Sequence, residues 1–330
     1  MKRTNVLLQE GGCLLGQAVV SCLRQAGNYR IIVTDIDPES LGLMRADLGY
    51  LIPKQWNKYD KRIHEIVEKE HIDIIIPCHD ISLSHLVRPS LKVPIIIDPK
   101  TVLIARDKYK TSEWLKDHSF LYPKTWKEPN EIEAFPVIVK PISGWGTKEL
   151  YKANNEKELE IYFSLCQQNG FKPIIQEILK GKEYTNMVYI SKDREILSST
   201  VTSVEKRGGV SYRMTILKDG DLNREIETIA EQLKAIGPIN MQGILTKEGF
   251  TIFELNARFS GTQDTRAYAG VNGPDLLIKN WLFNLKEYPK VTKSIKAFHC
   301  HLYYYIQEDK WKNRRERGQF GREGEIPIWL

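Results

Sequence analysis

A glutamate and an asparagine stand two residues apart in a segment that otherwise has the composition of a buried strand. The segment reads FTIFELN, residues 250–256, and the polar pair is Glu254 and Asn256. Strand alternation predicts that Ile252 shares a face with this pair and that Phe253 lies on the opposite face. A buried carboxylate without a partner costs several kcal/mol, roughly, so such a pair faces water or binds a cation. The segment alone leaves both interpretations open.

The preceding segment adds a third side chain with an oxygen donor. Residues 239–246, INMQGILT, and FTIFELN are separated by the turn Lys247-Glu248-Gly249, a pattern that predicts a β-hairpin. Gln242 then lies on the strand beside Glu254. Oxygen donors on neighbouring strands suit Mg²⁺ (or Mn²⁺), a hard cation that shares its coordination with substrate phosphates.

A lysine followed by glycines forms the second chemical pattern. In VIVKPISGWGTKEL, residues 137–150, Lys140 leaves a buried strand and enters a loop that contains Gly144, Gly146 and Thr147. Backbone N–H groups of such a loop can turn inward and cover a phosphate. The alternative is a lysine at a strand end beside an ordinary hairpin loop.

A third pattern lies in IIQEILKGKEYTNMVY, residues 174–189. A strand enters a glycine turn and extends again, with Glu183 at its start. Such a segment can offer backbone groups to an adenine edge while the acid reaches the ribose hydroxyls.

The order of these patterns resembles the ATP-grasp superfamily. Asp107-Lys108, then VIVKP with its glycine loop, then QEILKGKEY, then Gln242 and FELNAR follow one another along the chain. The likeness is greatest to the carbamoyl-phosphate-synthetase branch, which includes small carboxylate–amine ligases such as the pyrrolysine-pathway ligase. It covers residues 1 to about 285. No single motif is specific, whereas four in this order are.

The resemblance assigns roles to individual residues. It implies ATP contacts for Lys108, Lys140, Gly144, Gly146, Thr147, Gln176, Glu177, Leu179 and Glu183. It implies metal ligands at Gln242, Glu254 and Asn256, and catalytic contacts to the phosphoryl group from Arg258 and Lys140. Gln242 replaces the more usual acid, so one carboxylate remains for one or two ions.

The resemblance also implies a reaction. A small-molecule carboxylate attacks the γ-phosphorus of ATP, and an amine, often an amino acid, then displaces phosphate from the acyl phosphate. ADP and phosphate are released. A kinase or hydrolase that forms no amide is the alternative, and formation of a homodimer is left open.

The two substrates would lie between the N-terminal sheet domain and the larger ATP-grasp half. The candidate contacts are Asp80, Arg207, Arg213, Ser260, Thr262 and Arg266. Arginine can hold a carboxylate through two hydrogen bonds. His79 and Asp80 could equally cap the next helix.

The first hundred residues must supply a domain that covers these groups. Apolar runs at 5–9, 29–35, 72–77 and 93–98 alternate with helical patterns, which predicts a parallel sheet buried on both faces. Gly11-Gly12 lacks the G-x-G-x-x-G spacing, so NAD binding is disfavoured. A helix start behind these glycines could hold a substrate carboxylate.

We therefore expect an α/β fold with an N-terminal Rossmann-like pre-ATP-grasp domain and a two-lobed α+β ATP-grasp domain. The expected boundaries are 1–104 for the first domain, 105–178 for the small lobe with its lid, and 179–330 for the large lobe. The large lobe would carry the metal site and a basic C-terminal tail.

Composition is ordinary for a globular chain of 330 residues, with 42% hydrophobic and 27% charged residues. The net charge of +6 owes part of its surplus to residues 310–322, for which a solvated tail is favoured over a nucleic-acid patch. His299 and His301 alternate but lack a third ligand, which is more typical of structural histidines. Scattered cysteines without a C-x-x-C pair, and no signal peptide or long apolar span, predict a cytoplasmic protein that does not enter a membrane.

Overall fold

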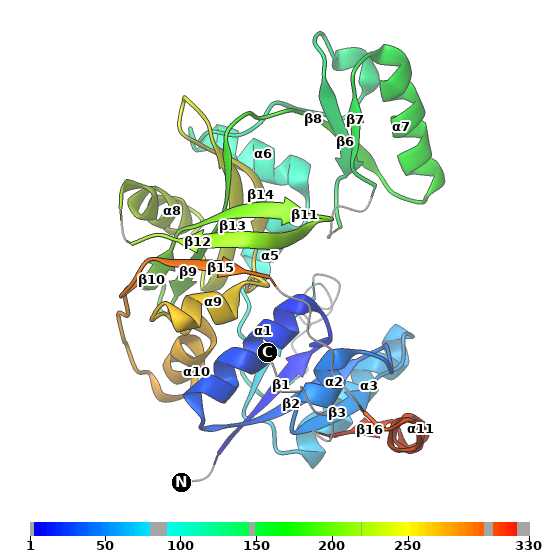
Figure 1. Cartoon of the computed structure of the whole chain (residues 1–330), viewed down its shortest axis with the longest axis vertical. Coiled ribbons are helices and arrows are strands. Elements are labelled where there is room, and N and C mark those ends of the chain that lie inside the picture. Colours follow the sequence, from blue (N-terminus) through cyan, green and yellow to red (C-terminus); the bar gives the residue numbers. More distant parts are fainter. Residues whose placement is uncertain (1–2, 80–90, 145–148, 219, 300–305, 322–330) are drawn as a thin grey trace.

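The computed structural model describes residues 3–79, 91–144, 149–218, 220–299 and 306–321. These residues form three sheets. Figure 1 shows the N-terminal domain at the bottom, a large sheet in the middle and a small lobe at the top. Of the residues assigned a function above, Asp80, Gly146 and Thr147 lie outside the described ranges, as does His301. No helix in the described part of the chain is long and apolar enough to span a membrane.

The N-terminal sheet has the strand order β16-β3-β2-β1-β4. Its parallel strands are β1 (Thr4–Gln9), β2 (Tyr29–Asp35), β3 (Leu48–Leu51) and β4 (Ile74–Pro77). Its helices are α1 (Leu14–Ala26), α2 (Leu41–Arg45) and α3 (Trp56–Lys69). The β-branched runs are fully buried because hydrophobic residues cover the sheet on both faces.

The prediction of a fourth strand at residues 93–98 is wrong. This segment makes only one isolated bridge, between Ile75 and Ile95. Pro94 has no N–H to give to a ladder, and Asp98 instead caps the next helix by accepting a hydrogen bond from the Lys100 N–H at 3.1 Å. The short β3 was not predicted.

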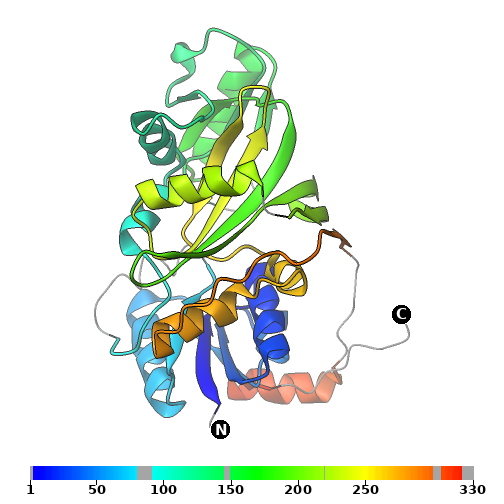
Figure 2. The ribbon, with the colours of Figure 1, turned by 90° about the vertical axis from the view of Figure 1, so that its left-hand side faces the viewer.

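The C-terminal basic run returns to the N-terminal domain. Residues 308–317 form the exposed helix α11 (Glu308–Arg317), and β16 (Gln319–Phe320) pairs antiparallel with β3. Phe320 is buried in the core of that domain. Figures 1 and 2 both show this segment beside the N-terminal strands. The described part of the run is therefore an exposed helix followed by a docked strand, and the expected solvated tail is wrong for the strand.

The small lobe is a four-stranded sheet in the order β5-β8-β6-β7. Its strands are β5 (Thr125–Trp126), β6 (Val137–Pro141), β7 (Tyr151–Ala153) and β8 (Pro173–Glu177), and helix α7 (Glu156–Gln168) packs on it. A 3₁₀ turn covers Pro129–Glu131. Helices α5 (Pro99–Ala105) and α6 (Lys108–Asp117) lead into the lobe, and both contact the large sheet.

The large sheet has the order β14-β13-β9-β11-β12-β15, and β10 pairs with β9. Its strands are β9 (Lys182–Ile190), β10 (Ile196–Thr200), β11 (Thr202–Arg207), β12 (Val210–Ile216), β13 (Gly237–Leu245), β14 (Phe250–Asn256) and β15 (Ile295–Phe298). Its helices are α8 (Asp221–Gln232), α9 (Gln263–Tyr268) and α10 (Gly273–Phe283). Helices α9 and α10 pack against α1, which joins this half to the N-terminal domain.

Candidate functional site

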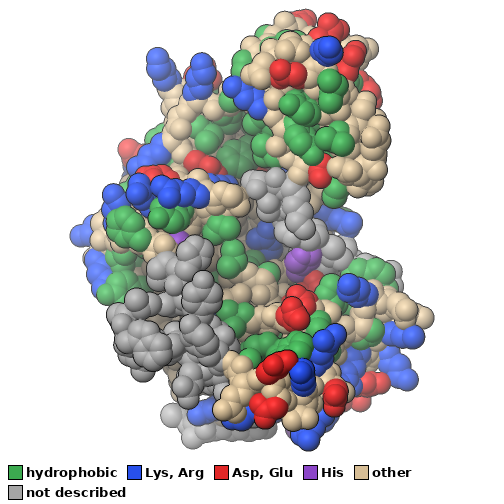
Figure 3. Space-filling model, turned by 45° about the vertical axis from the view of Figure 1, so that its right-hand side comes forward, with side chains coloured by type: hydrophobic (Ala, Val, Ile, Leu, Met, Phe, Trp, Pro, Cys, Tyr) green, Lys and Arg blue, Asp and Glu red, His purple; other side chains and the backbone are tan. Residues whose placement is uncertain are grey.

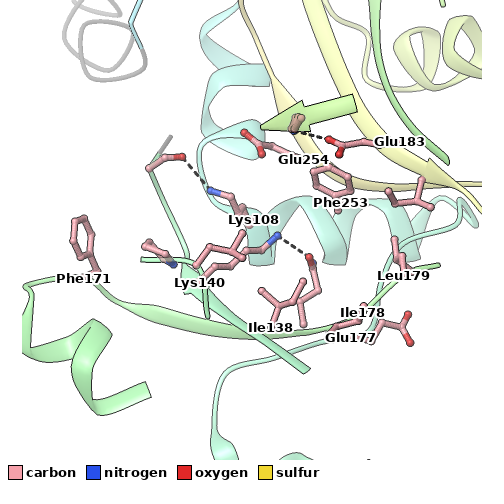
Figure 4. A pocket seen from close by; sticks show the side chains of 16 residues that line it. Lys108, Ile138, Lys140, Phe171, Glu177, Ile178, Leu179, Glu183, Phe253 and Glu254 are labelled. Atoms are coloured by element: carbon pink, nitrogen blue, oxygen red, sulfur yellow. Dashed lines mark hydrogen bonds and ion pairs between the residues drawn. The ribbon is translucent and has the colours of Figure 1, made fainter. Parts of the chain in front are cut away.

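A cavity of about 380 Å³ lies between the small lobe and the large sheet. Its apolar walls include Ile138, Ile178, Leu179 and Ile244, and its charged groups are Lys108, Lys140, Glu177, Glu183, Lys206 and Glu254. Figure 4 shows the Lys108 and Lys140 side chains inside this cavity, each with its ammonium joined to an oxygen of the small lobe, the Gly144 carbonyl and Gln176 Oε1 respectively. Apolar walls beside clustered lysines suit a flat base joined to phosphates.

Lys140 is the most buried charged group of this cavity. Its residue is 8% exposed, and its Nζ donates to Gln176 Oε1 at 2.7 Å. Gln176 is itself held by donating to Thr125 Oγ1 at 2.9 Å. Burial, together with nearby Lys108, lowers the pKa of Lys140 to about 7. A buried amine of this kind gains an ionic partner when an anion enters the cavity.

Lys108 ties the glycine loop to the helix before it. It begins α6 directly after Asp107, which caps the helix by accepting from the N–H groups of Tyr109 and Lys110 at 3.0 Å. Lys108 Nζ donates to the Gly144 carbonyl at 3.2 Å. Gly144 has φ of +132°, a conformation that side chains other than glycine rarely adopt. Asp107, Lys108 and Gly144 thus connect the start of α6 to the start of the glycine loop.

The segment between β8 and β9 lines the cavity through Glu177, Ile178 and Leu179. The Glu177 carboxylate accepts from the Lys124 N–H at 2.8 Å and points away from the other labelled side chains in Figure 4. The side chain of Gln176 is committed to Lys140, as described above. The side chains of Gln176 and Glu177 therefore bind other residues of the small lobe. An adenine ring in this cavity would contact the backbone of this segment.

A β-bulge in β14 changes the expected faces of the opening motif. Gln242 pairs with Glu254, but the next residue, Gly243, pairs with Ile252, so Phe253 is the extra residue. Ile252 is buried in the hydrophobic core, whereas Phe253 and Glu254 both line the cavity. The prediction that Ile252 shares a face with Glu254 is wrong, because the bulge reverses the alternation between them.

The three side chains predicted as metal ligands lie in one hydrogen-bonded group. Asn256 Nδ2 donates to Glu254 Oε1 at 3.3 Å, and Gln242 Oε1 accepts from Lys206 Nζ at 3.1 Å. Arg258 Nη2 donates to Asn256 Oδ1 at 3.2 Å. The oxygens of this group already face ammonium and guanidinium groups, so the donor set suits a cation.

Lys206 was not predicted, yet it connects Glu183 to the side chains predicted as metal ligands. Its Nζ lies 2.5 Å from Glu183 Oε1 and donates to Gln242. The sequence held a signal for this inward position, since Val204 and Lys206 alternate on β11 and Val204 is 5% exposed. A lysine on the buried face of a strand is a candidate for contact with an anion.

A second cavity, of about 710 Å³, lies between α1 and the large sheet. It shares Glu254 and Lys206 with the first cavity, so the two meet at these side chains. Arg258, Ser260 and Thr262 also line it. In Figure 3 this side of the molecule is hollowed between the upper lobe and the lower domain, with basic and histidine side chains facing the hollow.

Three predicted substrate contacts are not brought to either cavity. Arg207 lies over the Tyr212 ring at 4.0 Å, and Arg213 pairs with Glu205 at 3.3 Å with its side chain 42% exposed. Arg266 is fully buried, and its guanidinium donates to Thr200 Oγ1, the Thr185 carbonyl and Thr262 Oγ1. Burial lowers the pKa of Arg266. It reaches the second cavity only indirectly, through Thr185 and Thr262, which both line it.

Comparison with known families identifies the class of protein. Residues 105–262 match the ATP-grasp domain, and residues 12–94 match the PylC-like N-terminal domain. The chain therefore contains an ATP-grasp domain that follows a PylC-like N-terminal domain. The fold and family expected from the sequence are confirmed.

Individual relatives extend this result. In an alignment of 340 positions the chain is 22% identical to the 3-methyl-D-ornithine--L-lysine ligase of Methanosarcina barkeri. The alignment covers 97% of this chain and 87% of the relative. A D-alanine--D-alanine ligase of Fusobacterium nucleatum is 35% identical over 82 residues, or 25% of this chain and 27% of that one. The fold is also that of the N5-carboxyaminoimidazole synthetase of Staphylococcus aureus, solved with ADP. That structure has a TM-score of 0.72 and 16% identity over 99% of this chain and 93% of that one.

Proposed function

We propose that this chain is an ATP-dependent ligase that activates a small-molecule carboxylate as an acyl phosphate and joins it to an amine. ADP and phosphate are the other products. The names of relatives that are ligases support this class of reaction. We also propose a cytoplasmic location, since the described cysteines are free thiols.

The meeting of the two cavities at Glu254 and Lys206 is the observation that carries the proposal. A kinase and a ligase both need a nucleotide site beside an acceptor site. A ligase also needs room for two substrates in turn, and the second cavity is the larger of the two at about 710 Å³. Phosphoryl transfer at Glu254 would leave the acyl phosphate inside the space into which the amine must come.

The nucleotide is assigned to the first cavity. The adenine ring would pack between Ile138, Leu179 and Ile244. The triphosphate would take Lys140 and Lys108 as partners, and Gly144 would begin the cover over it. The Glu183 carboxylate would accept from the ribose hydroxyls, which requires its ion pair with Lys206 to open.

Mg²⁺ fits the oxygens of Gln242, Glu254 and Asn256. The single carboxylate provides the charge and the two amides provide neutral oxygens, so the phosphates would complete the coordination. When bound, the ion would neutralise charge on the transferred phosphoryl group. Lys206, whose ammonium contacts Gln242, would then be released toward the second cavity.

The chain's own residues have distinct parts in this reaction. Lys140 and Arg258 would stabilise the negative charge that develops on the phosphoryl oxygens as the carboxylate attacks. The small lobe and its loop would exclude water, which otherwise hydrolyses an acyl phosphate. A hydroxyl pair, Ser260 and Thr262, lies 3.0 Å apart and would contact the carboxylate substrate.

A substrate screen tests the proposal. ATP turnover is measured with amino acids and small acids, singly and in pairs, and the products are identified by mass. Turnover that depends on a pair and yields an amide supports the ligase. Turnover with one acid and no amide would instead establish the kinase or hydrolase alternative.

The basic helix α11 allows the nucleic-acid alternative to be tested separately. Arg314, Arg315 and Arg317 are in its last turn. Replacing the three with glutamine should leave nucleotide binding unchanged, whereas a nucleic-acid binder would lose salt-dependent affinity.

A further inference from the structure

A glutamate and a histidine form a pair at the edge of the N-terminal sheet. Glu10 directly follows β1 and His79 follows β4, and these two parallel strands are neighbours with Gln9 paired to Pro77. His79 Nδ1 lies 3.3 Å from Glu10 Oε2, and the side chains are 20% and 11% exposed. The carboxyl edge of a parallel sheet is where ligands of such domains bind.

Two further observations connect this pair to the reaction. His79 lines the second cavity, which also contains Glu254 and Lys206. Glu10 has φ of +52°, the left-handed region in which a residue with a long side chain is uncommon. Strain of this kind persists where the surrounding structure fixes it, and it is concentrated at functional sites. Here it coincides with the carboxylate that contacts the imidazole.

The proposed ligase reaction poses a proton problem that no residue assigned so far solves. An ammonium group has three protons and cannot attack a carbonyl carbon, while the product amide keeps one proton on nitrogen. One proton must leave before attack and another must leave as the C–N bond forms and the C–O bond to phosphate breaks. The second can depart on the phosphate, so the first needs a base.

We propose that His79 is the general base that removes the first proton from the incoming ammonium, with Glu10 as the residue that positions its ring. This inference rests on the proposed ligase function. Glu10 accepts from Nδ1–H, which leaves the lone pair on Nε2 for the amine proton. The free amine attacks the acyl carbon, and phosphate leaves with the electron pair of the C–O bond and the second proton. His79 then returns its proton to solvent.

The other titratable groups around the second cavity suit this task less. The N-terminal domain contributes Cys13, Cys78 and Arg45, and burial raises the pKa of both thiols. The ATP-grasp half contributes Arg258, Asp264 and His299, of which Asp264 and His299 are exposed. Asp264 also accepts from the Thr265 N–H at 2.8 Å in its own helix. Glu254 is assigned to the metal ion, and the Lys206 ammonium contacts Gln242 and Glu183.

The test separates acyl phosphate formation from amine attack. Hydroxylamine is already unprotonated at neutral pH, so it traps the acyl phosphate as a hydroxamate without a base. With the acid and amine found in the pairwise screen, His79→Gln should lose about 10²-fold in amide formation at pH 7. It should keep hydroxamate formation within about twofold of wild type. His118→Gln, an exposed change outside both cavities, is the matched control and should alter neither rate.

Dependence on pH provides the second measurement. Without a base, the rate should follow the fraction of free amine, so the deficit of His79→Gln should shrink about tenfold per pH unit above 7. Glu10→Gln should show a smaller deficit with the same rescue, because its amide can still accept from Nδ1. Equal loss of hydroxamate and amide in His79→Gln, or a deficit that does not depend on pH, would overturn the proposal. Absence of both products with the wild-type chain would instead overturn the proposed function on which it rests.

A measurement without substrates tests the same assignment. Nitrogen-15 spectra of the histidine rings, with His79 assigned by comparison with His79→Gln, report which nitrogen is protonated. We expect neutral His79 to hold its proton on Nδ1, and Glu10→Gln to weaken that preference. A proton on Nε2 in the neutral wild-type ring would leave no lone pair for the amine and would overturn the proposal by itself.

Discussion

The residues that line the two cavities are distributed differently along the chain. The first takes most of its charged groups from three short segments, around residues 138–144, 176–183 and 253–254. The second takes residues from α1, from the end of β4, from β12, from the loop before α9 and from the end of β15. The residues that a family has in common can thus be found in short sequence motifs. The cavity proposed to hold the two substrates is assembled only by the tertiary fold.

The cavities also differ in charge. The first places Lys108 and Lys140 among apolar walls, and this holds the Lys140 pKa at about 7. The second mixes basic, acidic, hydroxyl and apolar side chains. One is therefore suited to a single polyanion, and the other to substrates that carry several kinds of group. Variants in the first cavity should change ATP binding, whereas variants in the second should change the KM for the other substrates. This difference can be tested.

Glu254 belongs to both cavities, so its loss should have the largest effect. Glu254→Gln removes the only carboxylate of the proposed metal group while keeping the size of the side chain. We expect turnover to fall by about 10³-fold and the Mg²⁺ requirement to rise, with little change in stability. Turnover, its Mg²⁺ dependence and the denaturant midpoint are measured on the same variant. A large loss of stability with activity retained would show that Glu254 serves the fold instead.

Lys140 lies in the first cavity only. Lys140→Met should lower turnover by about 10²-fold and weaken ATP binding, because the triphosphate loses a charged partner. Stability should stay equal or rise, since a buried amine is replaced by an apolar side chain. Calorimetric titration with ATP and urea unfolding measure the two effects. Lys110→Ala, on the exposed side of α6, is the control; normal ATP affinity in Lys140→Met would separate this lysine from the phosphates.

The lowered pKa of Lys140 predicts opposite pH trends for stability and for nucleotide affinity. Between pH 7 and 10 the unfolded chain holds a proton on this amine that the folded chain lacks, so the free energy of unfolding rises with pH. The gain is on the order of 4 kcal/mol across this window. ATP favours the protonated amine, so its affinity should fall as the pH rises above about 7.

Both trends are measured as differences from Lys140→Met, which cannot titrate at this position. Urea unfolding of the apo proteins and calorimetric titration with ATP are carried out at pH 6.5, 7.5 and 9. Parallel curves for the wild type and the variant would contradict the assignment of a near-neutral pKa to Lys140.

Ser260 belongs to the second cavity only. Ser260→Ala should raise the KM for the carboxylate or amine substrate by roughly three- to tenfold, since one hydrogen bond to substrate is lost. The ATP affinity should not change. A change in ATP affinity with an unchanged substrate KM would reverse the roles of the two cavities.

Arg213 lies outside both cavities and should have the smallest effect. Its pair with Glu205 is exposed, and exposed pairs contribute about 0–1 kcal/mol. Arg213→Gln should leave turnover and both binding constants within about twofold. A strong effect on substrate KM would mean that the β11–β12 hairpin closes over the second cavity during turnover.

The sequence predicted the first cavity better than the second for a physical reason. Runs such as VIVKP and IDIIIP have the composition of buried strands, and a lysine at the end of such a strand is visible without any tertiary information. The Glu10 and His79 pair is not visible in this way, because 68 positions separate the strands that the sheet makes adjacent. Arg207, Arg213 and Arg266 were chosen for their chemistry, but the fold decides which arginines face a cavity.

The errors in the fold have similar causes. Alternation is a local rule, and the bulge at Phe253 depends on how β14 pairs with β13. Pro94 interrupts a run that otherwise has strand composition. A two-residue strand such as β16 is too short for any periodic pattern, so its pairing depends on the partner that β3 offers.

The pairing of β16 with β3 also affects how the protein forms during synthesis. Phe320 reaches Gly49 across roughly 270 positions of the chain. The edge of β3 therefore stays unpaired until the ribosome has completed both ATP-grasp lobes. Unpaired edges and exposed apolar surface make such incomplete domains prone to association. The nascent first domain is thus exposed to such association until its last strand is synthesised.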